Sequence, residues 1–335
     1  FQCCKVRKIT SRIVLSKEKR KDGCEVKMKK RGGIQKTSRK RNRALTCMAL
    51  PGVLLLFTFA YIPIFGLVLA FKDFRYDLGF WGSEWVGLEN FEFFFKSNSA
   101  WEVLRNTIGL NFLFIGGTLV VSVAIALMMN EVKSRGFTKV AQTIMFFPYF
   151  ISWVVAGYLL YTFLHHDYGI LNQILNFFGL ESVAWYSRAE YWPVILMIMA
   201  IWKGAGYNSI VYYAALMGID DNYYEAAALD GANRWQMIWK ISLPMIRGVI
   251  TIMTILAIGR IMYADYGMIL SLTREQGALL STTDVLDTYI LRALRVTGDT
   301  GVSSAVSCFQ AVVGFLLIMG SNMVARRIDE ESALF

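Results

Sequence analysis

Apolar residues in this chain are concentrated in six long runs, which are separated by shorter segments that contain charged residues, glycine and threonine. A helix needs roughly 20 mostly apolar residues to cross the hydrocarbon layer of a bilayer, and each run is long enough. The expected spans are residues 47–71, 107–129, 140–164, 192–217, 248–270 and 305–324. The pattern therefore predicts an all-α, polytopic membrane protein with six transmembrane helices.

The amino-acid composition agrees with this class. Of the 335 residues, 55% are hydrophobic and 18% are charged, which is more apolar surface than one soluble core could hide. The five cysteines show neither a CxxC pair nor a His-rich ligand spacing, so neither a disulfide framework nor a metal site is expected.

Positive charge is concentrated at the N-terminus, where residues 1–43 hold 17 Lys and Arg against three acidic residues. Such a tail suits nucleic acid, an anionic membrane surface or retention on the cytoplasmic side. Beside a span, the positive-inside rule favours retention with lipid contact, and no nucleic-acid partner is expected. We predict a basic cytoplasmic tail at 1–43, part of it a start-site artefact before Met28, and a membrane domain at 44–335.

The distribution of Lys and Arg over the loops predicts the orientation. The tail, the loops at 130–139 and 218–247 and the C-terminal segment together hold 25, whereas the loops on the opposite side hold eight. Both termini are therefore expected to be cytoplasmic.

The segment 220–244, between the fourth and fifth spans, is unusually helix-prone and aromatic for a loop. Asp221 or Asn222 can cap a first short helix, which Gly231 then ends or bends. A second helix is expected at 232–241. The segment can form a compact cytoplasmic knob, or an amphipathic helix in the lipid headgroups.

Seven positions in this segment follow a spaced pattern of Glu-Ala-Ala, three residues, Gly, nine residues and Ile-x-Leu-Pro. They are Glu225, Ala226, Ala227, Gly231, Ile241, Leu243 and Pro244. The pattern resembles the signature of the membrane subunits of binding-protein-dependent ABC importers. The resemblance implies the type I importer permease fold, with the seven residues in ATPase coupling and Pro244 at the start of the fifth span.

The resemblance also implies the partners. In that family the segment is a pair of coupling helices that inserts into a groove of a cytoplasmic ATPase and transmits its closure to the spans. The implied partners are an ATPase dimer, a second homologous permease subunit, an extracellular solute-binding lipoprotein and the lipid bilayer of a bacterial cell membrane. No Walker A pattern occurs in the sequence, so the chain is not expected to be an enzyme or to have a cofactor of its own, and ATP is expected to be bound by the partner ATPase.

Similarity to that family extends over roughly residues 45–335. The segments PYFISWVVAG, IGRIMYADYGMIL, TDVLDTYILRAL and FQAVVGFLLI look like the branch that imports complex carbohydrates, similar to the larger maltose-importer membrane subunit. The chain departs from that subunit because its first external loop, at 72–106, has no large inserted domain. The substrate that this resemblance implies is an oligosaccharide.

A sugar pathway needs aromatic faces and polar groups that replace water. The fourth and fifth spans supply candidates for a polar cavity in mid-membrane: Trp202, Lys203, Tyr207, Asn208, Arg260, Tyr263 and Asp265. The alternative is structural: the cations bond backbone carbonyls or Asp265, and the aromatic residues only pack. Asp284 and Asp287 suit either a seat for the lipoprotein or an ordinary amphipathic external helix.

An ion-coupled secondary transporter is the alternative function, with Lys203, Arg260 and Asp265 as an ion or proton relay. It predicts internal symmetry and broken helices. It leaves the spaced signature at 225–244 unexplained.

Overall fold

The computed structural model describes residues 45–132 and 134–328, so the whole of the predicted tail at 1–43 lies outside the described residues. The chain divides into two units, residues 1–63 and 64–335, and each is described by itself. The first predicted span is confirmed as a helical segment at Leu45–Phe71. Its helix type changes from a π turn, η1 (Phe57–Tyr61), to a 3-10 helix, η2 (Ile62–Phe71), beside Pro63, whose missing N–H interrupts the α-helical bonding.

The second unit is almost entirely helical. Its long helices are α5 (Asn98–Glu131), α6 (Arg135–Phe150), α7 (Trp153–Leu164), α9 (Trp192–Leu216), α12 (Leu243–Ile258) and α16 (Thr300–Ile328). Its short elements are β1 (Lys72–Asp73), α3 (Gly79–Gly82), β2 (Glu84–Trp85), α4 (Glu89–Lys96), α8 (Ile170–Phe177), η3 (Trp185–Ser187), η4 (Ala189–Tyr191), α10 (Asp221–Leu229), α11 (Arg234–Met237), η5 (Ile238–Ser242), α13 (Tyr266–Thr273), η6 (Gly277–Leu279), α14 (Leu280–Thr283), α15 (Leu286–Arg292) and η7 (Ala293–Thr297). The two strands pair antiparallel, with Lys72 opposite Trp85.

Five described helices are long and apolar enough to cross a membrane, and a bent pair brings the number to six. The second, fourth and sixth predicted spans are confirmed, with helices that extend beyond the predicted bounds at α5 and α16. Two predictions were wrong in detail. The third span is not one helix, because α6 and α7 meet at an angle of 97°. The fifth span ends at Ile258 rather than at residue 270, and a turn precedes α13.

Close packing between helices depends on glycine at two crossings. A Cβ atom on Gly206 of α9 would lie 1.9 Å from the carbonyl oxygen of Met145 in α6. A Cβ on Gly157 of α7 would lie 2.3 Å from the carbonyl oxygen of Ser271 in α13. The two halves of the broken span are therefore packed against different neighbours without room for a larger residue.

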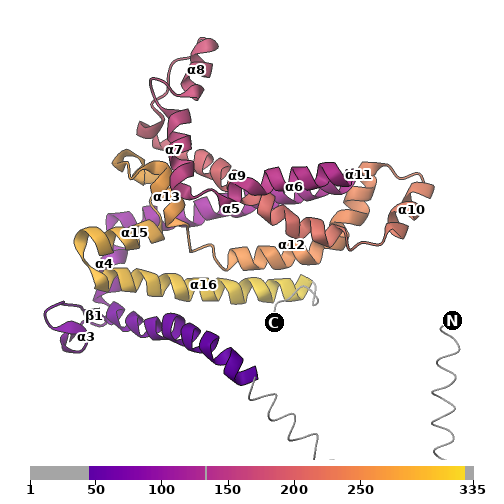
Figure 1. The fold of residues 1–335 in the computed structure, drawn as a ribbon. Coiled ribbons are helices and arrows are strands. Elements are labelled where there is room, and N and C mark those ends of the chain that lie inside the picture. Colours follow the sequence, from indigo (N-terminus) through magenta and orange to yellow (C-terminus); the bar gives the residue numbers. More distant parts are fainter. Residues whose placement is uncertain (1–44, 133, 329–335) are drawn as a thin grey trace, which may run out of the picture. The chain divides into compact units, whose positions relative to one another are not determined.

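The short helices lie at opposite ends of the second unit. Figure 1 shows α10 and α11 at one end of the long helices, and α4 and α15 at the other end. The segment of the spaced signature is thus remote from the segment that contains Asp284 and Asp287.

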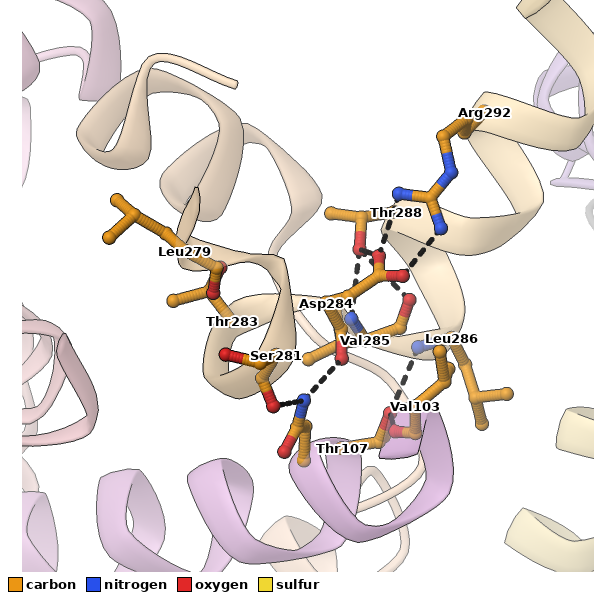
Figure 2. A network of polar contacts seen from close by, with 11 residues as sticks. Val103, Thr107, Leu279, Ser281, Thr283, Asp284, Val285, Leu286, Thr288 and Arg292 are labelled. Carbon is orange, nitrogen blue, oxygen red and sulfur yellow. Dashed lines mark hydrogen bonds and ion pairs between the residues drawn. The ribbon is translucent and has the colours of Figure 1, made fainter. Parts of the chain in front are cut away.

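A buried polar network fixes the segment between the fifth and sixth spans onto α5, as Figure 2 shows. The Asp284 carboxylate accepts hydrogen bonds from Thr288 Oγ1 at 2.8 Å and from the Arg292 guanidinium at 2.5 and 3.2 Å. The Thr107 hydroxyl accepts from the Leu286 N–H at 2.9 Å. Asp284 is only 6% exposed, which fits the structural interpretation of this residue rather than a docking one.

Candidate coupling segment and membrane cavity

The first helix of the segment 220–244 begins one residue earlier than predicted. Asp220, not Asp221 or Asn222, is the N-cap of α10, and its carboxylate accepts a hydrogen bond from the Asn222 N–H at 3.0 Å. All three residue types are good caps, so composition alone could not choose between them. Glu225 and Ala226 lie exposed on the resulting helix.

Gly231 ends α10 in a left-handed conformation, with a φ of +80°. The Ala232 N–H donates to the Ala227 carbonyl at 2.9 Å, and the Gly231 N–H donates to the Ala228 carbonyl at 3.1 Å. This pair of bonds is a Schellman motif, which satisfies the last carbonyls of the helix and requires a residue that tolerates positive φ. The predicted helix break at Gly231 is confirmed.

The second helix of the segment is continuous with the fifth span, which corrects the predicted boundary. A capping box between Asn233 and Gln236 starts α11 at Arg234, and a π turn at Ile238–Ser242 carries the helix into α12. Pro244 stands at the N-terminal end of α12, but the backbone is helical on both sides of it. Proline has no N–H to donate to the preceding turn, and the wider π turn before Pro244 lets the helix continue without that bond.

An ion pair joins the segment to a long helix, and a hydrogen bond joins its two helical parts to each other. Arg234 forms an ion pair with Glu131 at the end of α5, and the hydroxyls of Tyr224 and Ser242 lie 2.9 Å apart. A cavity of about 710 Å³ separates α10 from the ends of α5 and α9, with Glu225 on its wall. Leu229, at the tip, is 90% exposed. The segment thus presents one acid, small side chains and one leucine on a projecting turn.

The break in the third span is bound by Lys203 of α9. The Lys203 ammonium donates to the Tyr149 carbonyl at 3.1 Å and to the Ile151 carbonyl, and it lies 4.9 Å from the ring centre of Trp153. A broken helix leaves carbonyls without partners, which is costly where water is scarce. Lys203 satisfies them, as the structural alternative predicted.

Asp265 connects this break to the end of the fifth span. One of its carboxylate oxygens accepts from the Trp153 indole N–H at 2.5 Å, and the other accepts from the Met268 N–H at 3.0 Å as the N-cap of α13. Trp153 was not predicted, because its partner lies 112 residues away in the sequence. These two hydrogen bonds of Asp265 hold the starts of α7 and α13 in place.

The turn after α12 is held by side chains from three other helices. Asn111 of α5 donates to the Ile261 carbonyl at 2.9 Å, and Gln310 of α16 donates to the Met262 carbonyl at 2.6 Å. Asp287 of α15 accepts from the Ala264 N–H at 2.6 Å and from Gln310 at 3.1 Å. Burial raises the pKa of the Asp287 carboxyl above its usual value. Asp287 is therefore part of the scaffold of this turn.

A cavity of about 470 Å³ lies between α5, α9, α12 and this turn. Its lining residues are Phe114, Ile115, Thr118, Leu119, Ser122, Asn208, Tyr212, Met253, Thr254, Ala257, Arg260 and Asp265. The structure thus brings Asn208, Arg260 and Asp265 together, as the hypothesis of a polar cavity between the fourth and fifth spans requires. Its volume is in the range of small-ligand sites.

The other four predicted pathway residues are not among those that line this cavity. Lys203 lies at the helix break. Tyr207 stacks on Tyr149 of α6, with ring centres 4.4 Å apart. Trp202 and Tyr263 are each about 40% exposed, at 39% and 41%. The two aromatic residues of the cavity that sequence reasoning missed are Phe114 and Tyr212, which resemble any other aromatic residues in an apolar run.

Broken spans are a feature that the ion-coupled alternative also predicts, so comparison with known proteins is needed to decide the family. The sequence matches the family described as binding-protein-dependent transport system inner membrane component over residues 117–330. Those residues include the whole spaced signature and the turn at 259–265.

Individual relatives match over most of the chain. Protein LplB of Bacillus subtilis is 34% identical over 87% of this chain and 91% of its own length. The polygalacturonan/rhamnogalacturonan transport system permease protein YteP of the same organism is 35% identical over 87% of this chain and 90% of its own.

A solved structure agrees with the sequence comparisons. A chain in the crystal structure of a bacterial ABC transporter involved in the import of the acidic polysaccharide alginate superposes with a TM-score of 0.80 at 35% identity, and the match covers 88% of this chain and 98% of that chain. The projecting signature segment, the broken third span and these matches agree: this multi-pass membrane protein belongs to the family of binding-protein-dependent transport system inner membrane components, the permease subunits of ABC importers, which are not enzymes.

Proposed function

We propose that this chain forms half of the membrane pathway of an ATP-driven oligosaccharide importer, and that residues 220–244 couple it to a cytoplasmic ATPase. The observation that carries the coupling role is the Schellman turn at Gly231, which ends a projecting helix on which Glu225, Ala226 and Leu229 lie exposed. Small residues at the turn let a partner approach closely, and the exposed leucine supplies apolar contact area.

The remaining partners follow from the same proposal. A second homologous permease subunit completes the pathway, and a solute-binding lipoprotein delivers the sugar from outside. In a second solved structure, a related transporter is in complex with an alginate pentasaccharide-bound periplasmic protein, and the match covers 87% of this chain. The loop charges support cytoplasmic termini, with the basic tail at 1–43 and the permease domain at 44–335.

Co-purification from detergent tests the coupling role. The intact chain and a Gly231→Trp variant are expressed with the neighbouring permease subunit and the candidate ATPase. Gly179→Trp is the matched control, because Gly179 also has a positive φ, of +77°, and open space around its Cβ position, but it follows α8 far from the segment. We expect Gly231→Trp to lose the ATPase and Gly179→Trp to retain it.

Insertion into the membrane must be normal for all three proteins. If both variants lose the ATPase, the effect comes from backbone strain rather than from a docking surface. If the intact chain never holds an ATPase, the coupling role proposed for residues 220–244 is refuted.

A further inference from the structure

Arg260 differs from the other charged groups near the membrane cavity in having no compensating partner. Within residues 45–132 and 134–328 its guanidinium forms no hydrogen bond and no ion pair, and it lies exposed on the cavity wall. Asp265 lines the same cavity, but its oxygens accept from Trp153 and Met268. Lys203 donates to two backbone carbonyls. The cavity wall therefore carries two charged groups: the Asp265 carboxylate, which is held by two neutral donors, and the Arg260 guanidinium, whose donors have no partner within the described residues.

The position of this charge is fixed by its scaffold. Arg260 occupies the turn whose neighbouring peptide groups are bound by Asn111, Gln310 and Asp287. A free arginine within a membrane domain costs about 3 kcal/mol or more unless water or a partner compensates it, which makes it a functional position by default. Here three side chains, of which Asn111 and Gln310 are buried, keep the turn in place, although none of them bonds to the guanidinium of Arg260.

The chemistry of the cavity suits an anionic saccharide. A guanidinium presents parallel N–H donors that match the two oxygens of a carboxylate. Around it are the aromatic rings of Phe114 and Tyr212 and the amide of Asn208, which suit a sugar ring and its hydroxyls. We propose that the cavity takes oligosaccharides that carry carboxylates, such as uronic-acid oligomers, and that Arg260 selects them. This inference rests on the proposed function and narrows its substrate class.

The test compares oligogalacturonides with their methyl esters, which have the same rings and length but no charge. Uptake of both is measured in proteoliposomes that contain the complete transporter and its binding protein, for the intact chain and for Arg260→Gln and Arg260→Lys. Because the binding protein is the same in every sample, a changed ratio of acid to ester uptake comes from this chain. Arg295→Gln is the control, since it removes an external, exposed arginine outside this cavity.

We expect Arg260→Gln to lower the ratio of acid to ester uptake by about tenfold or more, the size expected for one charge-assisted pair. Arg260→Lys should give an intermediate ratio, because lysine keeps the charge but loses the bidentate geometry. Arg295→Gln should leave the ratio unchanged.

Five results would overturn the inference, and the last of them would also overturn the proposed function. If Arg260→Gln reduces the uptake of acid and ester equally, Arg260 has a structural role. If it changes the uptake of neither, Arg260 does not contribute to transport. If the Arg260→Gln variant loses the second permease subunit on size-exclusion chromatography, Arg260 pairs with a carboxylate of that subunit. Transport of neutral oligosaccharides by the intact complex without transport of the acids refutes the substrate class but leaves oligosaccharide import standing. Transport of no saccharide by an assembled, ATP-hydrolysing complex refutes the proposed function itself.

Discussion

The coupling segment is shaped mainly by bonds between residues close together in the sequence. The break between α6 and α7 and the turn at 259–265 are held by bonds between residues far apart in the sequence. In the coupling segment, Asp220, Gly231 and the Asn233–Gln236 box bond to groups within five residues of themselves. At the breaks, Trp153 and Asp265 are 112 residues apart, and Asn111 reaches Ile261 across 150 residues. A local motif can therefore move as a unit against a partner, whereas the breaks hold their geometry only while several helices stay packed.

The largest effect on stability is expected at the crossing of α6 and α9, where the packing of distant helices can be tested directly. We expect Gly206→Ala to destabilise the chain by about 3 kcal/mol, because its Cβ would stand 1.9 Å from the Met145 carbonyl oxygen and the two helices must separate. Thermal unfolding of the purified protein in detergent measures the change.

Gly204→Ala, on the same helix, is the matched control. Its Cβ would meet Thr118 at 3.5 Å, an ordinary contact, so its stability should stay within about 1 kcal/mol of the intact chain. Equal melting temperatures for Gly206→Ala and Gly204→Ala would show that the close approach is not a constraint.

Removal of the Lys203 charge should have the next largest effect. We expect Lys203→Met to cost about 2 kcal/mol, because the Tyr149 and Ile151 carbonyls lose a charged donor at the helix break. Hydrogen exchange should also become faster at the start of α7. Lys139→Met, a loss of an exposed cation near the start of α6, should change neither quantity. A Lys203→Met protein as stable as the intact chain would mean that water satisfies those carbonyls.

These two regions also differ in what the sequence could reveal. The Schellman turn was predictable because Gly231 follows a run of alanines, and its bonds are local. The π turn before Pro244 was not, since propensity does not distinguish it from an α-helical start. In the third span, the polar residues Gln142, Thr143, Ser152 and Thr162 are scattered among the 25 residues at 140–164. Together with Pro148 they are too weak a signal for a 97° bend.

Polar residues inside apolar runs were the signal that could have located the turn at 259–265, between α12 and α13. Gln310 is a strongly polar residue inside the sixth run, and such a residue in a membrane helix usually bonds to a neighbouring backbone. Gly259, Arg260 and Asp265 interrupt the fifth run, so its end before residue 270 was predictable from polarity. Which carbonyl each side chain reaches was not predictable, because that depends on how α5, α15 and α16 pack.

A milder change tests whether the coupling turn acts through its backbone. We expect Gly231→Ala to cost about 1 to 2 kcal/mol in the turn, because alanine disfavours a φ of +80°, and to reduce ATP-dependent uptake. Gly231→Asn should retain more uptake than Gly231→Ala, since asparagine tolerates left-handed conformations despite its larger side chain. The reverse order, measured in proteoliposomes, would indicate that side-chain size rather than conformation decides the coupling.

The smallest expected effect is on the pH dependence of stability, through Asp287, which holds the turn at 259–265. Burial raises the pKa of Asp287, so the folded state binds its proton more tightly than the unfolded state does. The contribution of this group to stability is then fully present below its unfolded pKa and is lost as the pH rises through the higher folded pKa. An amide oxygen can still accept from Ala264 and Gln310, so Asp287→Asn keeps these bonds without a buried charge.

We therefore expect Asp287→Asn to be at least as stable as the intact chain at pH 7, and its advantage to shrink as the pH falls towards 4. Melting temperatures of the two proteins across this range give the difference, and common effects of acid on other groups cancel. Asp287→Ala should be less stable than both at every pH, because the Ala264 N–H loses its acceptor. An advantage that grows with acidity would mean that Asp287 is stabilised as a carboxylate, and that its bonds to the turn outweigh its burial.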